Sequence, residues 1–248
     1  MSDEHIVKSF GEELERIDQL IVEMGGLAET QLASAIRALV RRDAELANHV
    51  VDGDARIDDL ESEVNERIIR LLALRQPMAG DLRVAIAALK ISNELERIGD
   101  YAKNVAKRTV VLVQSPAMPA TLAISRMGTL VQGMIKAVLD AYVARDALAA
   151  EDVRLADQEV DQLHTSMFRE ILTYMMEDPR NITPCTHLLF IAKNIERIGD
   201  HTTNIAENVH FLVRGEDPDG GRPKRDRSSS TMVKPASSAA AAGTSGNQ

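Results

Sequence analysis

Pairs of acidic residues spaced four positions apart could bind a cation. Asp54 and Asp58 form one such pair, and Glu96 and Asp100 form another. On a helix, residues i and i+4 lie on one face with Cβ atoms roughly 5–6 Å apart, so each pair places two like charges side by side. Such a pair destabilises an isolated helix by roughly 0.2–0.5 kcal/mol unless a cation lies between the two carboxylates.

Both pairs recur in the second half of the chain, which indicates an internal duplication. The segment RDAELANHVVDGDARID is repeated as RDALAAEDVRLADQEVD at an offset of 103 residues, and LERIGDYAKN is repeated as IERIGDHTTN at an offset of 100. Neighbouring surface positions differ between the halves, as Lys103 and Thr203 show, whereas the acids are kept. The sequence therefore predicts eight cation ligands: Asp54, Asp58, Glu96, Asp100, Asp157, Asp161, Glu196 and Asp200.

The ligand chemistry leaves two uses for these acids open. Oxygen-only ligands favour hard or borderline cations such as Mg²⁺, Mn²⁺, iron or Ca²⁺, and carboxylates also bind Zn²⁺. Arg97 and Arg197 lie inside the repeated motif and could instead neutralise the same acids. A single acid pair on an exposed helix is usually solvated, so the duplication is what favours a cation site.

Composition and breaker residues predict the elements that must carry these acids. Hydrophobic residues make up 44% of the chain, charged residues 27% and aromatic residues only 3%, a balance that favours helices. Turn signals divide each half into three helices, near 5–41, 43–75 and 81–113, then near 120–144, 146–177 and 184–213. Because the counterpart of Gly53 is Ala156, we expect no break at Gly53.

Helical periodicity assigns the faces of these helices. Seven apolar residues form one stripe on the third helix and should face the bundle interior: Val84, Ala88, Ile91, Leu95, Ile98, Ala102 and Val105. The acids are expected on outward or flanking faces. Gly99 and Gly199 are costly within helices, and their repetition predicts a close helix–helix approach. Short loops between long amphipathic helices predict an all-α fold of two tandem antiparallel three-helix bundles related by a pseudo-two-fold axis.

The predicted domains are residues 1–114, the first bundle, residues 115–214, the second bundle, and a tail of residues 215–248. The tail is rich in Gly, Pro, Ser and Ala and has no apolar face, so we expect it to be disordered.

Several classes of function are disfavoured. A net charge of −9 would repel a phosphate backbone, so nucleic acid is not an expected partner. The single cysteine, Cys185, excludes an internal disulfide framework. No basic or apolar leader and no long apolar run are apparent, which predicts a chain that is neither exported nor membrane-spanning. The chain also lacks a Gly-rich phosphate loop, an activated nucleophile and the inward Glu-x-x-His sets of di-iron enzymes.

The motifs LERIGDYAKN and IERIGDHTTN, each following a Pro-containing turn, resemble those of the PhoU family of phosphate-specific transport system accessory proteins, over about residues 5–213. The resemblance implies two three-helix bundles, similar to spectrin repeats, that carry multinuclear iron or zinc clusters on the eight acids; manganese or magnesium is also compatible. It implies a cytoplasmic homodimer, peripheral at the inner membrane and without enzymatic activity.

The same resemblance implies a negative regulator of phosphate uptake and of the phosphate-starvation response. Its partners would be the phosphate ABC transporter and the phosphate-sensing histidine kinase. Two alternatives remain at this point: a metal-free helical adaptor, and a less favoured carboxylate-bridged di-metal enzyme.

Overall fold

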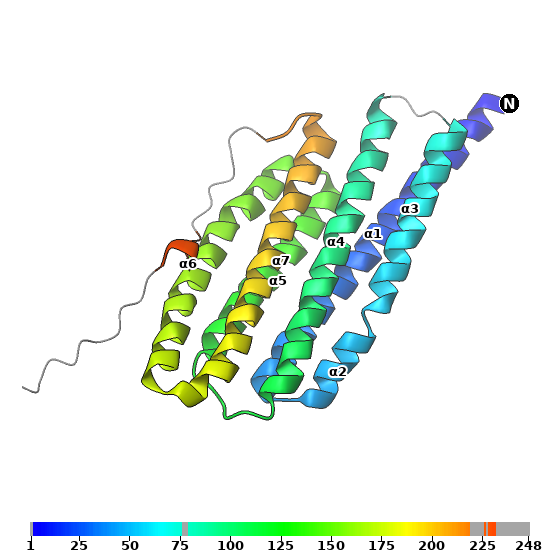
Figure 1. Ribbon diagram of the computed structural model, residues 1–248. Helices are drawn as coiled ribbons and strands as arrows, with labels where there is room; N and C mark the ends of the chain where they lie inside the picture. The colour runs from blue at the N-terminus through cyan, green and yellow to red at the C-terminus, as the bar shows by residue number, and fades with distance from the viewer. Residues whose placement is uncertain (1, 76–78, 219–225, 227, 232–248) are drawn as a thin grey trace, which may run out of the picture.

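The computed structural model describes residues 2–75, 79–218, 226 and 228–231, and every regular element in these ranges is a helix. The prediction of an all-α fold is therefore confirmed (Figure 1). The elements are α1 (Ser2–Arg41), α2 (Ala44–Asp52), α3 (Ala55–Arg75), α4 (Ala79–Leu112), α5 (Thr121–Ala144), α6 (Ala147–Glu177) and α7 (Ile182–Arg214), with the short 3₁₀ helices η1 (Pro179–Asn181) and η2 (Ser228–Ser230).

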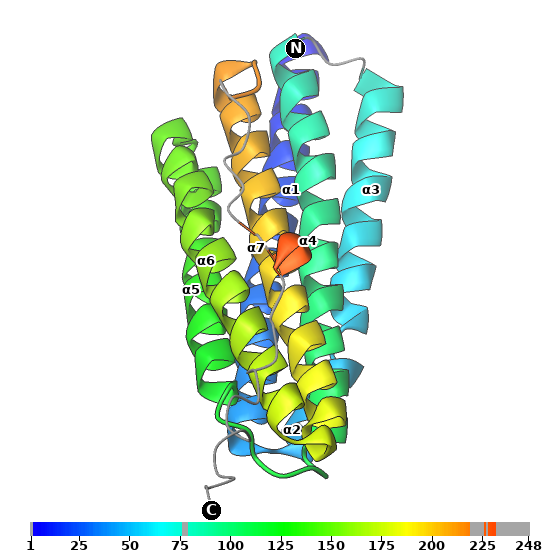
Figure 2. The ribbon, with the colours of Figure 1, turned by 60° about the vertical axis from the view of Figure 1, so that its left-hand side comes forward.

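The long helices lie side by side in two groups (Figures 1 and 2). The first group contains α1, the α2–α3 arm and α4, and the second contains α5, α6 and α7. Contacts of α4 with α7 and of α1 with α5 join the two groups. One continuous cluster of buried apolar residues runs through both, so the two bundles share a core.

The apolar stripe predicted on α4 is buried. Ile91, Leu95 and Ile98 have no exposed surface, and Val84 at the start of the stripe packs against the core while partly buried. The corresponding stripe on α7 is also buried: Leu188, Ile191, Ile195, Ile198, Thr202, Ile205 and Val209. Helix period therefore places the remaining faces of α4 and α7, which carry four of the eight acids, beside or outside the core.

Two glycines allow α1 and α5 to cross closely. A Cβ atom on Gly25 would overlap the Leu139 side chain, and one on Gly128 would lie 2.7 Å from Ile36 Cδ1. The repeat offset of 103 residues relates Gly25 to Gly128 and Ile36 to Leu139, so the two contacts exchange under one rotation. The duplicated halves thus meet through a self-complementary surface of the kind found in two-fold dimers.

The second helix of the first bundle is broken, contrary to the prediction. Helix α2 ends at Asp52, the Gly53 N–H donates to the His49 carbonyl over 3.0 Å, and α3 begins at Ala55. In the second bundle α6 continues through Ala156 without a break. Glycine is less favourable than alanine in a helix by about 1 kcal/mol, which explains why the break occurs in the half that has Gly53.

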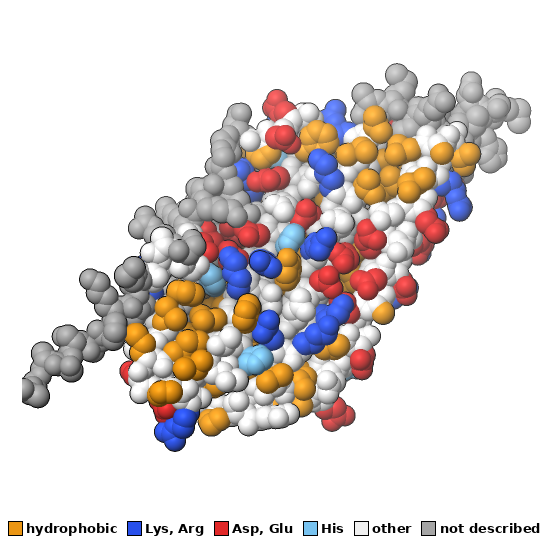
Figure 3. Space-filling view, in the orientation of Figure 1, with side chains coloured by type: hydrophobic (Ala, Val, Ile, Leu, Met, Phe, Trp, Pro, Cys, Tyr) orange, Lys and Arg blue, Asp and Glu red, His pale blue; other side chains and the backbone are white. Residues whose placement is uncertain are grey.

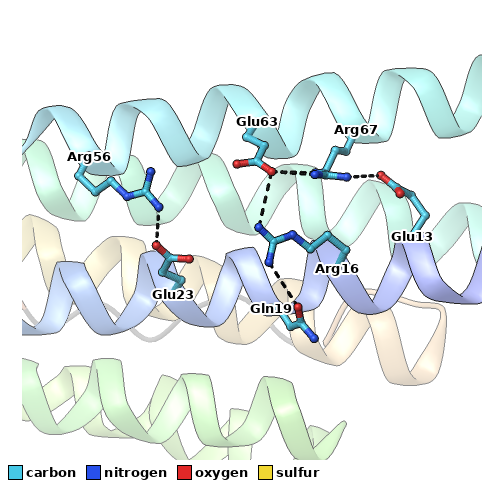
Figure 4. Close-up of polar contacts among 7 residues, drawn as sticks. All are labelled: Glu13, Arg16, Gln19, Glu23, Arg56, Glu63 and Arg67. Carbon is cyan, nitrogen blue, oxygen red and sulfur yellow. Dashed lines mark hydrogen bonds and ion pairs between the residues drawn. The ribbon is translucent and has the colours of Figure 1, made fainter.

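Ion pairs hold α3, which follows this break, against α1 (Figure 4). Arg67 contacts Glu13 over 2.8 Å and Glu63 over 2.9 Å, and Arg56 contacts Glu23 over 2.7 Å. These side chains are largely solvent-accessible, so the pairs add little to stability and mainly orient α3.

Helix α5 is the one described helix long and apolar enough to cross a membrane by length and composition alone. Many of its apolar residues are buried against other helices of the bundle, as Ile124, Val131 and Ile135 show, whereas Leu122 and Val143 are exposed. It lies against α1, α6 and α7, which is the environment of a core helix.

Candidate functional site

Two acids of the first bundle are joined by a lysine. Lys103 on α4 forms ion pairs with Asp54 Oδ2 and with Asp100 Oδ1, the latter over 3.0 Å. Asp54 lies at the break between α2 and α3, is buried, and also accepts a hydrogen bond from Gln31 Nε2 over 2.9 Å. The Lys103 ammonium therefore lies between one carboxylate from the α2–α3 break and one from α4.

The other two acids of this cluster are crowded by like charges. Partial desolvation raises the pKa of Asp58, which still reaches the surface, and the neighbouring Asp54 and Asp100 carboxylates raise it further. Burial also raises the pKa of Glu96, with additional repulsion from Asp100 and Asp58. The structure thus brings the four predicted acids of the first half within interaction distance. We call Asp54, Asp58, Glu96 and Asp100 the first acid cluster.

The second half assembles the equivalent acids, but deeper in the protein. Asp157 and Asp161 of α6 and Glu196 of α7 are each less than 5% exposed, and Asp200 is partly buried. Lys193 Nζ contacts Glu196 Oε1 over 2.7 Å, whereas Glu196 Oε2 is buried without a hydrogen-bond partner in the described structure. Burial raises the pKa of Glu196, and the Asp200 charge raises it further. These four residues form the second acid cluster.

Half of the acids correct the expectation of outward or flanking faces, because Asp54, Asp157, Asp161 and Glu196 are buried. Asp58 is exposed, and Glu96, Asp100 and Asp200 are partly exposed, as expected. Gly99 and Gly199 supply the physical reason. A Cβ atom on Gly99 would lie 3.3 Å from Asp54 Oδ1, and one on Gly199 would lie 3.0 Å from Asp157 Oδ1. The predicted close approach is therefore confirmed, and its effect is to let a carboxylate of the neighbouring helix lie against α4 or α7.

One residue of the tail, Asp226, lies beside the second acid cluster. Asp226 Oδ1 accepts a hydrogen bond from Thr165 Oγ1 over 3.2 Å and lies 3.4 Å from His164 Nδ1, while Asp226 Oδ2 lies 3.5 Å from Lys193 Nζ. These charges and hydrogen bonds from Ser228 hold the pKa of Asp226 down, at about 2, despite its burial.

The prediction of disorder from residue 215 onward is wrong at residues 226 and 228–231, because polar contacts hold them against α6. Residues 219–225, 227 and 232–248 lie outside the described ranges. No periodicity or motif in the tail could have revealed the contact of Asp226.

Both clusters have a donor set that fits a cation, although each also holds a lysine. They supply oxygen ligands, and the unpartnered Glu196 Oε2 together with the raised pKa values of Asp58 and Glu96 shows that the carboxylates are incompletely compensated. Within the ranges that the structure describes, no three His, Cys, Asp or Glu side chains are grouped closely enough to hold a metal ion as they stand. A bound cation would have to displace the ammonium of Lys103 or Lys193.

Arg97 and Arg197, which could have neutralised the acids, contribute little to their neutralisation. Arg97 Nε lies 3.7 Å from Glu96 Oε2, and the Arg197 guanidinium lies over the Tyr101 ring, 5.6 Å from its centroid. The counter-charges are Lys103 and Lys193, which sequence reasoning missed because neither recurs at the equivalent position of the other half.

Comparisons with known proteins agree with the duplication. The family model for the PhoU domain matches residues 21–109 and again residues 124–209. A phosphate-specific transport system accessory protein PhoU homolog from Caulobacter vibrioides is 56% identical over 90% of this chain and 97% of its own. One from Rhizobium meliloti is 50% identical over 92% and 97%.

Solved structures show the same arrangement. The crystal structure of PhoU from Pseudomonas aeruginosa has a TM-score of 0.81 at 41% identity and covers 84% of this chain and 100% of its own. The phosphate transport system regulatory protein PhoU from Streptococcus pneumoniae has a TM-score of 0.78 at 30% identity and covers 85% and 99%.

Proposed function

Because the chain belongs to the PhoU family, and so has an accessory role in regulating phosphate transport, we propose that it is a negative regulator of phosphate uptake and of the phosphate-starvation response. The observation that carries this proposal is the match over nearly the full length of named accessory proteins. The family is regulatory and not enzymatic, so the di-metal enzyme alternative is set aside.

We propose that regulation works through protein contacts. The partners would be subunits of the phosphate ABC transporter and the phosphate-sensing histidine kinase, at the cytoplasmic side of the inner membrane. A homodimer is part of the same proposal. The long helices support regulation through protein contacts, because they offer extended surfaces on which several partners can bind.

The two acid clusters are proposed to bind iron or zinc, with manganese or magnesium as further candidates. The first cluster would use Asp54, Asp58, Glu96 and Asp100, and the second would use Asp157, Asp161, Glu196 and Asp200. A bound cation would neutralise the crowded carboxylates and leave α4 and α7 with a different surface charge. The unpartnered, buried Glu196 Oε2 is the strongest support for this assignment.

A metal-free adaptor is the second candidate, and one observation favours it. Lys103 already bridges Asp54 and Asp100, so the first cluster is partly neutralised by the protein itself.

Metal analysis and binding measurements distinguish the two candidates. We expect protein purified without chelators to contain iron or zinc, and expect alanine at Glu96, Asp100, Glu196 and Asp200 to abolish that content and to weaken binding to purified transporter and kinase subunits. The matched control replaces the exposed acids Glu12, Glu15, Asp152 and Glu159 and removes the same charge. Near-zero metal in the wild-type protein would favour the adaptor. Loss of metal with unchanged subunit binding would exclude a role of the clusters in partner contacts.

A further inference from the structure

The contact between α4 and α7 carries cations that are held over aromatic rings. The Arg108 guanidinium of α4 lies 4.1 Å from the centroid of Phe190, which is half-exposed on α7. The Arg197 guanidinium of α7 lies over Tyr101 of α4. Such cation–π contacts fix the orientation of a guanidinium while leaving its N–H groups available to an anion.

These cations lack carboxylate partners. Among the described residues, Lys107, Arg108 and Arg197 form no ion pair within 4.0 Å, although the chain carries 38 acidic residues. We call these three residues the basic band. Figure 3 shows Lys and Arg side chains on this face between two groups of Asp and Glu side chains.

The other end of the α4–α7 contact carries more acidic and amide side chains. At the positions equivalent to Lys107 and Arg108, α7 carries Glu207 and Asn208. These two residues line a polar cavity of about 550 Å³ together with Glu94 of α4. Lys90 at this end also lies over an aromatic ring, that of Phe211, but it shares its cavity with Glu94 and Glu207. The end with Lys107 and Arg108 is therefore the more basic of the two.

We propose that the basic band is the docking site for an acidic segment of a partner protein. This inference rests on the proposed regulatory function, because it names the chemistry of the partner's contact. The spacing of the two arginines favours a segment over a single phosphate ion. Arg197 lies over the ring of Tyr101, and Tyr101 precedes Arg108 on α4 by seven residues, about 10 Å of helix rise. Carboxylates along an extended chain or a helix can reach both arginines, whereas one phosphate cannot.

The flanking charges favour a narrow partner over a membrane surface. The first acid cluster lies on the α3 side of the band and the second lies on the α6 side. A flat anionic bilayer covering the band would also meet both acid clusters, which would repel it. A single acidic segment that spans Arg108 and Arg197 can contact these cations without covering either acid cluster.

A labelled peptide tests the docking chemistry directly. The probe is a fluorescein-labelled ten-residue peptide of Asp and Glu, titrated by anisotropy into the full-length protein at low and high salt. We expect the triple variant Lys107→Gln, Arg108→Gln, Arg197→Gln to bind about tenfold or more weakly than wild type. The control variant Arg70→Gln, Arg126→Gln, Arg169→Gln removes three exposed arginines elsewhere and should bind as wild type does. Equal binding by the two variants, or no binding by wild type, would overturn the proposal.

Two further probes separate this proposal from the proposed function. Purified transporter and kinase subunits should bind the triple variant more weakly than the control. If wild type binds the peptide through the band but binds neither subunit, the proposed function fails and the docking chemistry stands. If the triple variant loses binding to vesicles of phosphatidylglycerol and phosphatidylcholine but keeps peptide binding, the band is a membrane contact and the proposal is wrong.

Discussion

The two halves of the molecule have the same four-acid pattern but neutralise it differently. In the first half Lys103 joins Asp54 to Asp100, so a lysine links the two helical arms. In the second half Lys193 contacts Glu196 on its own helix, and the acids of α6 are buried beneath it. The position equivalent to Lys103 is Thr203, whose hydroxyl donates instead to the Asp200 carbonyl over 2.8 Å.

The two halves share their acids and glycines but differ in the residues that neutralise the acids. The acids and the glycines beneath them are the same in both halves, because a carboxylate can lie against the helix only where no Cβ intervenes. The position of the counter-charge differs between the halves, since a lysine contacts the acids from position 103 in the first half and from position 193 in the second. The tail adds Asp226 to the second cluster alone.

Exchanging the lysine between the halves should have the largest effect. Lys103→Thr removes the ammonium from the first cluster, and Thr203→Lys adds one to the second. Because a charge-assisted contact contributes about 1.5–3 kcal/mol, we expect Mn²⁺ affinity to rise at the first cluster and fall at the second by roughly 10–100-fold. Isothermal titration of metal-free protein measures both changes.

The control for this exchange is Lys136→Thr, which removes an exposed lysine paired with Asp140 on α5. It should leave Mn²⁺ affinity unchanged. If Lys103→Thr behaves like this control while its melting temperature stays near that of wild type, Lys103 does not compete with a cation and the comparison between the clusters fails.

Alanine at the two glycines should destabilise both halves, the first more than the second. A Cβ on Gly99 meets three atoms within 3.0–3.3 Å, including Gln31 Oε1, whereas one on Gly199 meets only Asp157 Oδ1 at such a distance. Against the roughly 1 kcal/mol gained from helix propensity, overpacking costs about 1–3 kcal/mol. We expect net losses of about 2 kcal/mol for Gly99→Ala and about 1 kcal/mol for Gly199→Ala, measured by urea denaturation.

Gly133→Ala is the matched control, because a Cβ there meets nothing within 4 Å on α5. It should stabilise the chain by about 0.5–1 kcal/mol. Equal stabilisation by all three substitutions would show that the carboxylates do not need the glycines.

Individual residues show which parts of the fold and of the acid clusters could be predicted from the sequence. Periodicity predicted the buried stripe through Ile91 and Ile198, because helix period depends only on spacing. Repetition identified the acids and the role of Gly99. The break at Gly53 was not predicted, because the equivalent Ala156 indicated a continuous helix. The burial of Asp157 was not predicted, because the angular position of a residue on one helix does not show which helix packs over it. Lys193 and Asp226 come together only through the fold.

The pH dependence of stability should differ between Glu196 and Glu96. Each has a pKa raised above 4.5 by burial, so its stabilising contribution is complete below that pH and is lost as the pH rises through the folded-state pKa. Replacement by Gln should therefore reduce the fall in melting temperature of metal-free protein between pH 5 and 8. The Glu196 side chain is 5% exposed against 25% for Glu96, so we expect about 2–4 °C for Glu196→Gln and less for Glu96→Gln. An equal or reversed order, measured by calorimetry, would contradict a deeper second cluster.

The smallest effect should come from making the α2–α3 arm resemble α6. Gly53 has a right-handed helical φ of −75°, so alanine fits there without backbone strain, and its Cβ would lie 3.3 Å from the His49 carbonyl. We expect Gly53→Ala to stabilise the chain by about 0.5 kcal/mol at most, because gained helix propensity is partly offset by this close contact.

The reverse substitution tests whether glycine alone makes the break. Ala156→Gly in the unbroken α6 should cost about 1 kcal/mol and should speed amide exchange near residue 156, while Gly53→Ala should slow exchange near residue 53. If Gly53→Ala leaves exchange unchanged, the break is imposed by the Asp54 carboxylate, which Lys103 and Gln31 hold in place. The first acid cluster would then shape its helix, whereas in the second half the helix places the acids.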